Sequence, residues 1–312
     1  MAGERPFQAI EAYSGAIARQ PDSVLAHYKR GTVYQSQNEL EDALRDFRSA
    51  ADLDPASLRV IESVGDVNAA LGRHERAVER YEAFVALDER NARVQYKLGL
   101  ARYRTGRVIQ AAQPLQQALT LDPSLTEALY VLGLVQRDSN QMAAARKSLE
   151  EAAKRAPAGQ TAAREALAEL FLQEGDFGRA INQLEALAAL DPSRPERLVA
   201  VGLTQARAGR DDAAVMTLGR ALERFPDASQ VYAALGHVWL VQAQRRGDRV
   251  ALTKALEALT HAAYGTDVSG ETYAELAHAS VLTGDRTGAE RADRKSTPSE
   301  LQSRLHLVCR LL

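Results

Sequence analysis

The chain has 312 residues; 46% are hydrophobic but only 5% are aromatic, so its core must be built mainly from Ala, Leu and Val. Charges of both signs are interspersed and the formal net charge is −2, which excludes a basic block for neutralising phosphates and predicts no nucleic-acid partner. No stretch reaches the roughly 20 apolar residues of a transmembrane helix, so no membrane span is predicted.

Small residues and prolines recur along the chain at a nearly constant interval. Ala9, Tyr13, Ala16 and Pro21 lie in residues 1–22, and the same types return 34 residues later. One series is Gly31, Gly65, Gly99, Gly133, Ala168, Gly202 and Gly236; a second is Ala43, Ala77, Ala111, Ala145, Ala180 and Ala214; a third is Pro55, Pro123, Pro157, Pro192 and Pro226. Three series in one register indicate an internal structural repeat.

Each repeat predicts two antiparallel helices of about 12–14 residues joined by a turn. Small residues fit where the paired helices cross, and large residues fill the grooves between them. Glycines at 72, 106, 175, 209 and 284 predict left-handed turns that end the first helix. Asp-Pro pairs, as at 54–55, predict the end of the second helix. Because one hairpin cannot bury its apolar face alone, neighbouring hairpins are expected to stack.

The organisation follows from this register. Residues 1–22 predict an orphan second helix, which is either a capping helix or the sign of a start placed too late. Residues 24–293 predict about seven full repeats and a truncated eighth. An insertion near 241–251 stretches the seventh repeat, because Gly236 to Ala255 spans 19 residues where other repeats have 12. It is expected either to lengthen both helices or to form a protruding loop.

The last segment, residues 294–312, ignores the repeat. Its stretch SELQSRLHLVCRLL resembles the translation of a sequencing adaptor, so this tail is expected to be non-native or disordered, with the natural protein continuing differently. Cys309, the single cysteine, lies there, which excludes a disulfide framework or a thiolate metal site in the rest of the chain.

The unit Gly31, Tyr34, Ala43, Phe47, Ala50 and Pro55 resembles the tetratricopeptide repeat family, and the resemblance extends over roughly residues 3–293. It implies an all-α fold, a right-handed α-solenoid (superhelix) of stacked helix-turn-helix repeats. It also implies a concave groove, lined by the first helix of each repeat, that binds a protein or peptide.

Carrying the family's groove positions onto this register selects Tyr28, Arg93, Tyr96, Leu100, Tyr103, Arg104, Tyr130, Leu134 and Arg137. The middle of this set predicts an apolar, aromatic strip bordered by arginines. Tyr and Arg are over-represented among residues that dominate binding energy. The expected partner is an amphipathic helix or an extended segment with an acidic edge. Tyr28 and Thr32 replace the Lys and Asn with which one subfamily clamps the chaperone carboxylate, so that ligand is not expected.

Motifs for catalysis, nucleotide binding or metal binding are missing from the sequence, and no two histidines lie three or four residues apart. We therefore expect no enzyme activity, no cofactor and no metal. The leading hypothesis is a bacterial-type binding scaffold, cytoplasmic, or periplasmic if the true N-terminus is missing. The alternative is a regulatory or substrate-docking array of a larger enzyme, such as a protein glycosyltransferase, truncated here.

Overall fold

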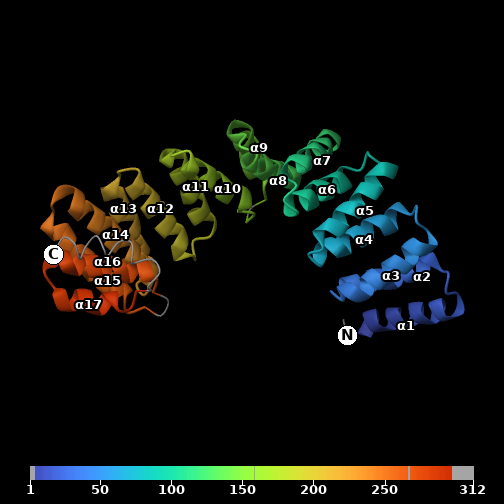
Figure 1. Cartoon of the computed structure of the whole chain (residues 1–312), viewed down its shortest axis with the longest axis horizontal. Helices are drawn as coiled ribbons and strands as arrows, with labels where there is room; N and C mark the ends of the chain where they lie inside the picture. The colour runs from blue at the N-terminus through green and yellow to red at the C-terminus, as the bar shows by residue number, and fades with distance from the viewer. Residues whose placement is uncertain (1–3, 158, 266–267, 297–312) are drawn as a thin grey trace. The chain divides into compact units, whose positions relative to one another are not determined.

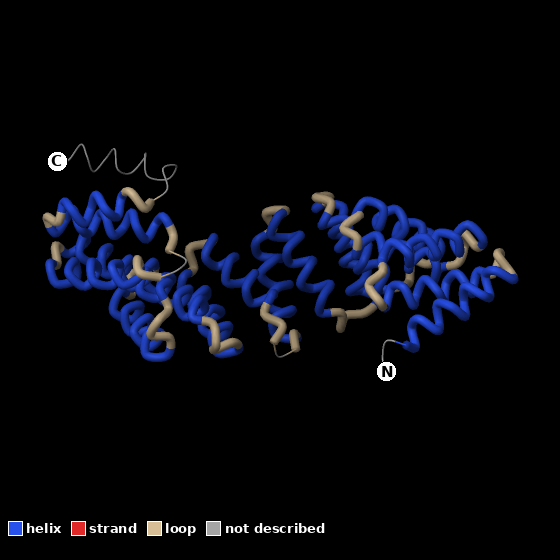
Figure 2. The backbone as a smooth tube through the Cα atoms, turned by 90° about the horizontal axis from the view of Figure 1, so that it is seen from below, coloured by secondary structure: helices blue, strands red, loops and turns tan. Residues whose placement is uncertain are grey.

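The structure, a computed structural model, describes residues 4–157, 159–265 and 268–296. Every regular element in these ranges is an α-helix, and Figure 2 shows helices joined by short loops without a strand. The predicted all-α fold is thereby confirmed. The adaptor-like stretch and Cys309 lie outside the described residues.

Residues divide into two compact units, with the break between Ala156 and Pro157. In the N-terminal unit an unpaired helix is followed by four antiparallel hairpins (Figure 1). The helices are α1 (Glu4–Arg19), α2 (Val24–Ser36) with α3 (Leu40–Leu53), α4 (Leu58–Ala70) with α5 (His74–Leu87), α6 (Ala92–Arg104) with α7 (Val108–Leu121), and α8 (Thr126–Asp138) with α9 (Met142–Arg155).

The C-terminal unit contains four further hairpins. They are α10 (Ala162–Gln173) with α11 (Phe177–Leu190), α12 (Pro195–Arg207) with α13 (Asp211–Arg224), α14 (Ser229–Arg246) with α15 (Arg249–Ala262), and α16 (Gly270–Thr283) with α17 (Arg286–Asp293).

In six of the described hairpins the two helices cross at a glycine, a residue without a side chain. A Cβ atom built on Gly99 would lie 2.5 Å from Leu115 Cγ, and one on Gly202 would lie 2.6 Å from Leu218 Cγ. Such distances are too short for two carbon atoms, so glycine is required for this approach. The other crossings of the same kind pair Gly31 with Phe47, Gly65 with Tyr81, Gly133 with Leu149 and Gly236 with Leu259.

The turns inside the hairpins use left-handed residues. All five glycines expected there have positive φ, including Gly72 at 72° and Gly284 at 86°. Asn38 (φ 61°) and Asn140 (φ 60°) occupy the corresponding turns of two other hairpins. Asparagine is the residue that best replaces glycine in this conformation, because its short polar side chain tolerates the left-handed region.

The stretched hairpin differs from its neighbours in one helix. α14 has 18 residues, whereas α15 has the 14 residues that are usual for second helices of this chain. α14 ends at Gly247, which has φ 65°, and Asp248 caps α15 by accepting hydrogen bonds from the backbone N–H groups of Val250 and Ala251. The additional residues thus extend the first helix and leave a short, capped turn.

Helix α1 is attached to the first hairpin by a buried polar network. Arg30 on α2 donates to both carboxylate oxygens of Asp46, at 2.8 and 2.7 Å, and to the hydroxyl of Ser14 on α1 at 2.9 Å. His27 lies 3.3 Å from the same carboxylate. Asp46 is buried, so these partners satisfy a charge that would otherwise be costly to remove from water.

Replacing a crossing glycine should destabilise the stack. Gly202→Ala places a methyl group against Leu218, and overpacking of this kind lowers the free energy of unfolding by about 1–3 kcal/mol. Gly219→Ala is the matched control, because nothing lies within 4 Å of that position in the partner helix α13. Its better helix propensity should raise the free energy of unfolding by about 0.5–1 kcal/mol. Urea unfolding followed by circular dichroism measures both; shifts of equal sign would contradict the role given to Gly202.

Candidate functional site

First helices of neighbouring hairpins lie side by side in both units. α6 packs against α8 in the N-terminal unit, and α14 packs against α12 and α16 in the C-terminal unit. Among the described helices, no pair of second helices packs against each other to a comparable extent. The face of the first helices is therefore the inner face of these stacked hairpins.

In the N-terminal unit, this face carries five aromatic and apolar side chains that we call the aromatic strip: Tyr96, Leu100, Tyr103, Tyr130 and Leu134. All five are half-buried. The three tyrosines and Leu100 pack against the core cluster that contains Leu115 and Leu132. The packing of α6 on α8 therefore brings the predicted strip residues onto one surface, with part of each side chain anchored in the core.

Two phenol groups of the strip are kept in their protonated form. The Tyr103 hydroxyl donates to Asp138 Oδ2 at 2.7 Å; burial and this carboxylate raise the pKa of Tyr103 to about 12. Burial, together with the charge of Glu127, also raises the pKa of Tyr96. Both phenols are protonated at neutral pH; the Tyr103 proton is donated to Asp138, so toward a ligand its oxygen can act as an acceptor.

The predicted arginine border is less uniform than the sequence suggests. Arg93 and Arg104 are exposed, and neither forms an ion pair within the described part of the chain. Arg137 donates from Nε to Asp138 Oδ1 at 2.9 Å. Part of its charge is thus compensated by Asp138, which leaves Arg93 and Arg104 as the stronger sources of positive potential.

Tyr28 is placed apart from the aromatic strip. Its ring centroid lies 5.6 Å from that of Phe47, and the guanidinium of Arg59 lies 5.8 Å from it. It packs against the core cluster formed by α3 and α4, and its own hairpin is the third before that of α8. The predicted site residues therefore form one contiguous group on α6 and α8, with Tyr28 as an outlying member.

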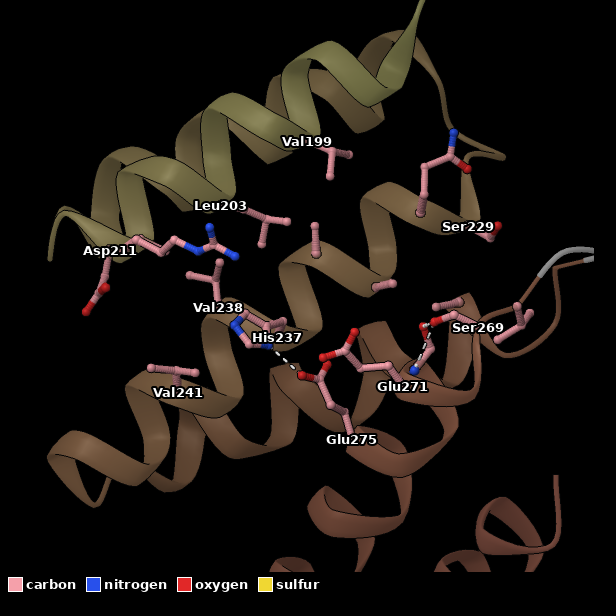
Figure 3. Close-up of a pocket in the computed structure, with 18 of the residues that line it drawn as sticks. Val199, Leu203, Asp211, Ser229, His237, Val238, Val241, Ser269, Glu271 and Glu275 are labelled. Atoms are coloured by element: carbon pink, nitrogen blue, oxygen red, sulfur yellow. Dashed lines mark hydrogen bonds and ion pairs between the residues drawn. The ribbon is translucent and has the colours of Figure 1, made fainter. Parts of the chain in front are cut away.

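A second feature of the first-helix face is a cavity of about 400 Å³ in the C-terminal unit, which we call the α14 pocket. Its walls come from α12, α14 and α16, and Figure 3 shows their side chains converging on it. The apolar part includes Val199 and Leu203 of α12 and Val238 and Val241 of α14. The longer α14 contributes a final turn, including Arg245, that the other first helices lack.

Acidic side chains of α16 line one side of the α14 pocket. His237 Nδ1 lies 2.5 Å from Glu275 Oε1, and this hydrogen bond raises the pKa of His237 although burial opposes it. Glu271, one turn earlier, points toward the same space in Figure 3. It has no hydrogen bond or ion pair with another described residue.

Basic side chains lie at the other end of the pocket. Arg207 of α12 is exposed, whereas Arg245 and Arg246 each lie 3.7 Å from a carboxylate oxygen of Asp211. The Asp211 side chain is 6% exposed, so these two arginines compensate a charge held out of water. The α14 pocket thus has an acidic side on α16 and a largely compensated basic side near α13.

Val199, Leu203 and His237 stand at first-helix positions of the repeat register, whereas the acidic residues of the eighth repeat were not singled out from the sequence. Because the insertion lengthens the seventh repeat by seven residues, Glu271 corresponds in register to Gln230, and extending the register by that longer interval would have found it. The proximity of Glu275 to His237 depends on the packing of α14 against α16 and has no equivalent signal in the sequence.

Two further classes of site are missing from the part of the chain that is described. It contains no group of three or more His, Cys, Asp or Glu side chains placed to hold a metal ion. None of its helices combines the length and the apolar character needed to cross a bilayer.

Comparison with protein families gives matches over most of the chain. A family model described as tetratricopeptide repeat matches residues 1–57, 65–126 and 130–195, and a second model with the same description matches residues 171–238. No curated protein gives a significant match.

Solved structures show the same fold at low sequence identity. The pilF protein of Pseudomonas aeruginosa is 22% identical with a TM-score of 0.52, covering 72% of this chain and 96% of that one. A tetratricopeptide repeat protein of Parabacteroides merdae is 15% identical with a TM-score of 0.54, covering 82% of this chain and 98% of that one. A chain of the APC/C hetero-tetramer Cut9–Hcn1 is 18% identical with a TM-score of 0.52. The match covers 75% of this chain and 46% of that one.

Titration of two histidines should separate the effects of pairing and burial. We expect His237 to titrate above the ordinary value of about 6.5, because protonation strengthens its bond to Glu275. His278, on the same helix as Glu275, should titrate below it, because burial disfavours its charged form. In Glu275→Gln the His237 pKa should fall; NMR titration measures all three values, and an unchanged His237 would refute the pairing.

The same shift predicts the pH dependence of stability. Because the pKa of His237 is higher in the folded than in the unfolded chain, the stabilisation by the His237–Glu275 pair is fully present below about pH 6.5. It is lost as the pH rises through the folded-state pKa. Urea midpoints measured on both sides of this range should differ less in Glu275→Gln than in the unmodified chain.

Proposed function

We propose, because this chain belongs to the tetratricopeptide repeat family, that it is a protein-interaction scaffold holding a segment of another protein on its first-helix face. The fold serves many unrelated functions, so the partner has to be argued from the side chains that this chain presents. In the N-terminal unit, the surface we assign to this role is the aromatic strip with Arg93 and Arg104.

The observation that carries the proposal is the half-burial of the strip. Tyr96, Tyr103 and Tyr130 have part of each ring packed in the core and part available to a ligand. Side chains fixed in this way lose little conformational freedom on binding. The Tyr103 hydroxyl is also oriented by Asp138. A surface of this kind favours tight binding of a partner segment in one defined orientation.

The chemistry of the partner follows from the charges that remain around the strip. Arg93 and Arg104 are exposed and their charges are not balanced by ion pairs with described residues. An amphipathic helix, or an extended segment, with an apolar face and an acidic edge would complement both features. The hypothesis of an array that serves a larger enzyme stays a prediction.

Photo-crosslinking from the strip can identify the partner directly. A photoreactive phenylalanine derivative replacing Leu134 lies within the strip, whereas one replacing Ile109 lies on the second helix α7, where the side chain is 84% exposed. We expect a discrete crosslinked protein at position 134 that is missing at position 109. Mass spectrometry of that product names a candidate whose affinity can be measured with purified proteins.

Removal of two strip tyrosines should abolish binding of the crosslinked partner. Tyr96→Ala with Tyr130→Ala removes the largest apolar contacts, and we expect the helical circular dichroism to be largely retained because the buried crossing residues are unchanged. Ile109→Ala is the matched control, since it removes an exposed apolar side chain from the same hairpin. Equal affinities of the double variant and the control for the partner would exclude the aromatic strip as the binding site.

Substitution of Arg93 and Arg104 tests whether the partner has an acidic edge, and it leaves the buried core of this chain unchanged. Arg93→Gln with Arg104→Gln should lower the affinity for the partner several-fold. It should also reduce the dependence of that affinity on salt concentration, because both charges face solvent. A salt dependence identical to that of the unmodified chain would exclude an acidic edge on the partner.

A further inference from the structure

The α14 pocket is separate from the aromatic strip: its walls belong to the C-terminal unit and its chemistry is different. Apolar side chains of α12 and α14 form part of the lining, and two carboxylates of α16 stand one helical turn apart on another side. An occupant must therefore combine an apolar stretch with a group that satisfies these carboxylates.

The acidic side has more negative charge than its own neighbours balance. Glu271 and Glu275 together carry two negative charges, and His237 supplies at most one positive charge when it is protonated. The Glu275 side chain is 16% exposed, so its charge is only weakly screened by water. Glu271 is exposed, so water screens part of its attraction for a cation, whereas Glu275 is mostly buried and is paired with His237.

The basic side offers a weaker attraction for an anion. Arg245 is already within 3.7 Å of Asp211, a carboxylate that is buried and also close to Arg246. Arg207 is exposed, as Glu271 is, and its charge acts through space on His237. The lining contains three carboxylates, Asp211, Glu271 and Glu275, and two arginines, Arg207 and Arg245, so with His237 neutral it carries one excess negative charge, which favours a cationic group.

Arginine and lysine side chains combine the two required features, because each has an apolar stem and a charged end. The planar guanidinium of arginine donates several hydrogen bonds in fixed directions, which suits two neighbouring carboxylates better than the single ammonium of lysine. The cavity of about 400 Å³ is large enough for such a side chain with part of its backbone.

We propose that the α14 pocket binds a basic side chain of a peptide segment, arginine in preference to lysine, with its stem against Val199, Leu203 and Val238 and its charge between Glu271 and Glu275. The ligand is a peptide, as in the proposed function, but the site is formed by other residues and recognises the opposite charge. Its success or failure is independent of the aromatic strip.

The test uses capped heptapeptides and the full chain. A peptide with a central Arg between Leu and Ala residues is compared with one in which citrulline, a neutral analogue of the same shape, replaces it, and with one carrying Glu. Binding is followed by calorimetry and by NMR shifts of the α12, α14 and α16 amides. We expect the Arg peptide to bind about tenfold more tightly than the citrulline peptide.

Glu271→Gln should remove most of this difference, because it removes the carboxylate charge that has no hydrogen bond or ion pair with a described residue and acts on His237 only through space. Glu257→Gln, on the exposed side of α15, is the matched control and should leave the preference unchanged. The Tyr96→Ala and Tyr130→Ala changes should also leave it unchanged, which distinguishes this site from the aromatic strip.

Three results would overturn the proposal: equal affinity for the Arg and citrulline peptides, tighter binding of the Glu peptide, or equal effects of Glu271→Gln and Glu257→Gln. Failure of the Arg peptide to shift the amides of α12, α14 and α16 at millimolar concentration would overturn it as well.

Discussion

The close contact between a glycine backbone and one large side chain is the constraint on which each hairpin depends. At Gly99 and Gly133 the space that a Cβ would need is already filled by Leu115 and Leu149. Both leucines are fully buried. The fifth hairpin shows what happens without the glycine: Ala168 stands at the crossing, and its partner Leu184 is 9% exposed rather than 0%.

The same constraint separates residues that build the stack from residues that a partner meets. Crossing residues must be small on the first helix and large on the second, so they repeat with the period and carry no information about a ligand. Side chains on the first-helix face that do not lie at a crossing are free of this requirement. They differ between the units: tyrosine and arginine dominate on α6 and α8, and carboxylates stand on α16.

The sequence was sufficient for the parts of the fold that follow from period and local chemistry. Crossing glycines and left-handed turn glycines recur at one interval, and each has a backbone reason to be glycine. The turns at Asn38 and Asn140 were harder to predict, because asparagine also occurs at many other places. Pairings between hairpins were not predictable: Asp138 accepts from Tyr103 across 35 residues and Glu275 meets His237 across 38, which depends on rotamers and helix packing.

Pairing between hairpins also decides which charges a partner encounters. Several charges on or beside the first helices are balanced by the next hairpin: Lys97 lies 2.6 Å from Glu62 and 2.7 Å from Asp66, and Arg197 lies 2.5 Å from Glu165. Such pairs attract an approaching ion far less than a single charge does, because their fields largely cancel. The charge pattern relevant to recognition is therefore what remains after internal pairing. That remainder is positive beside the aromatic strip, at Arg93 and Arg104, and negative on the α16 side of the α14 pocket, at Glu271.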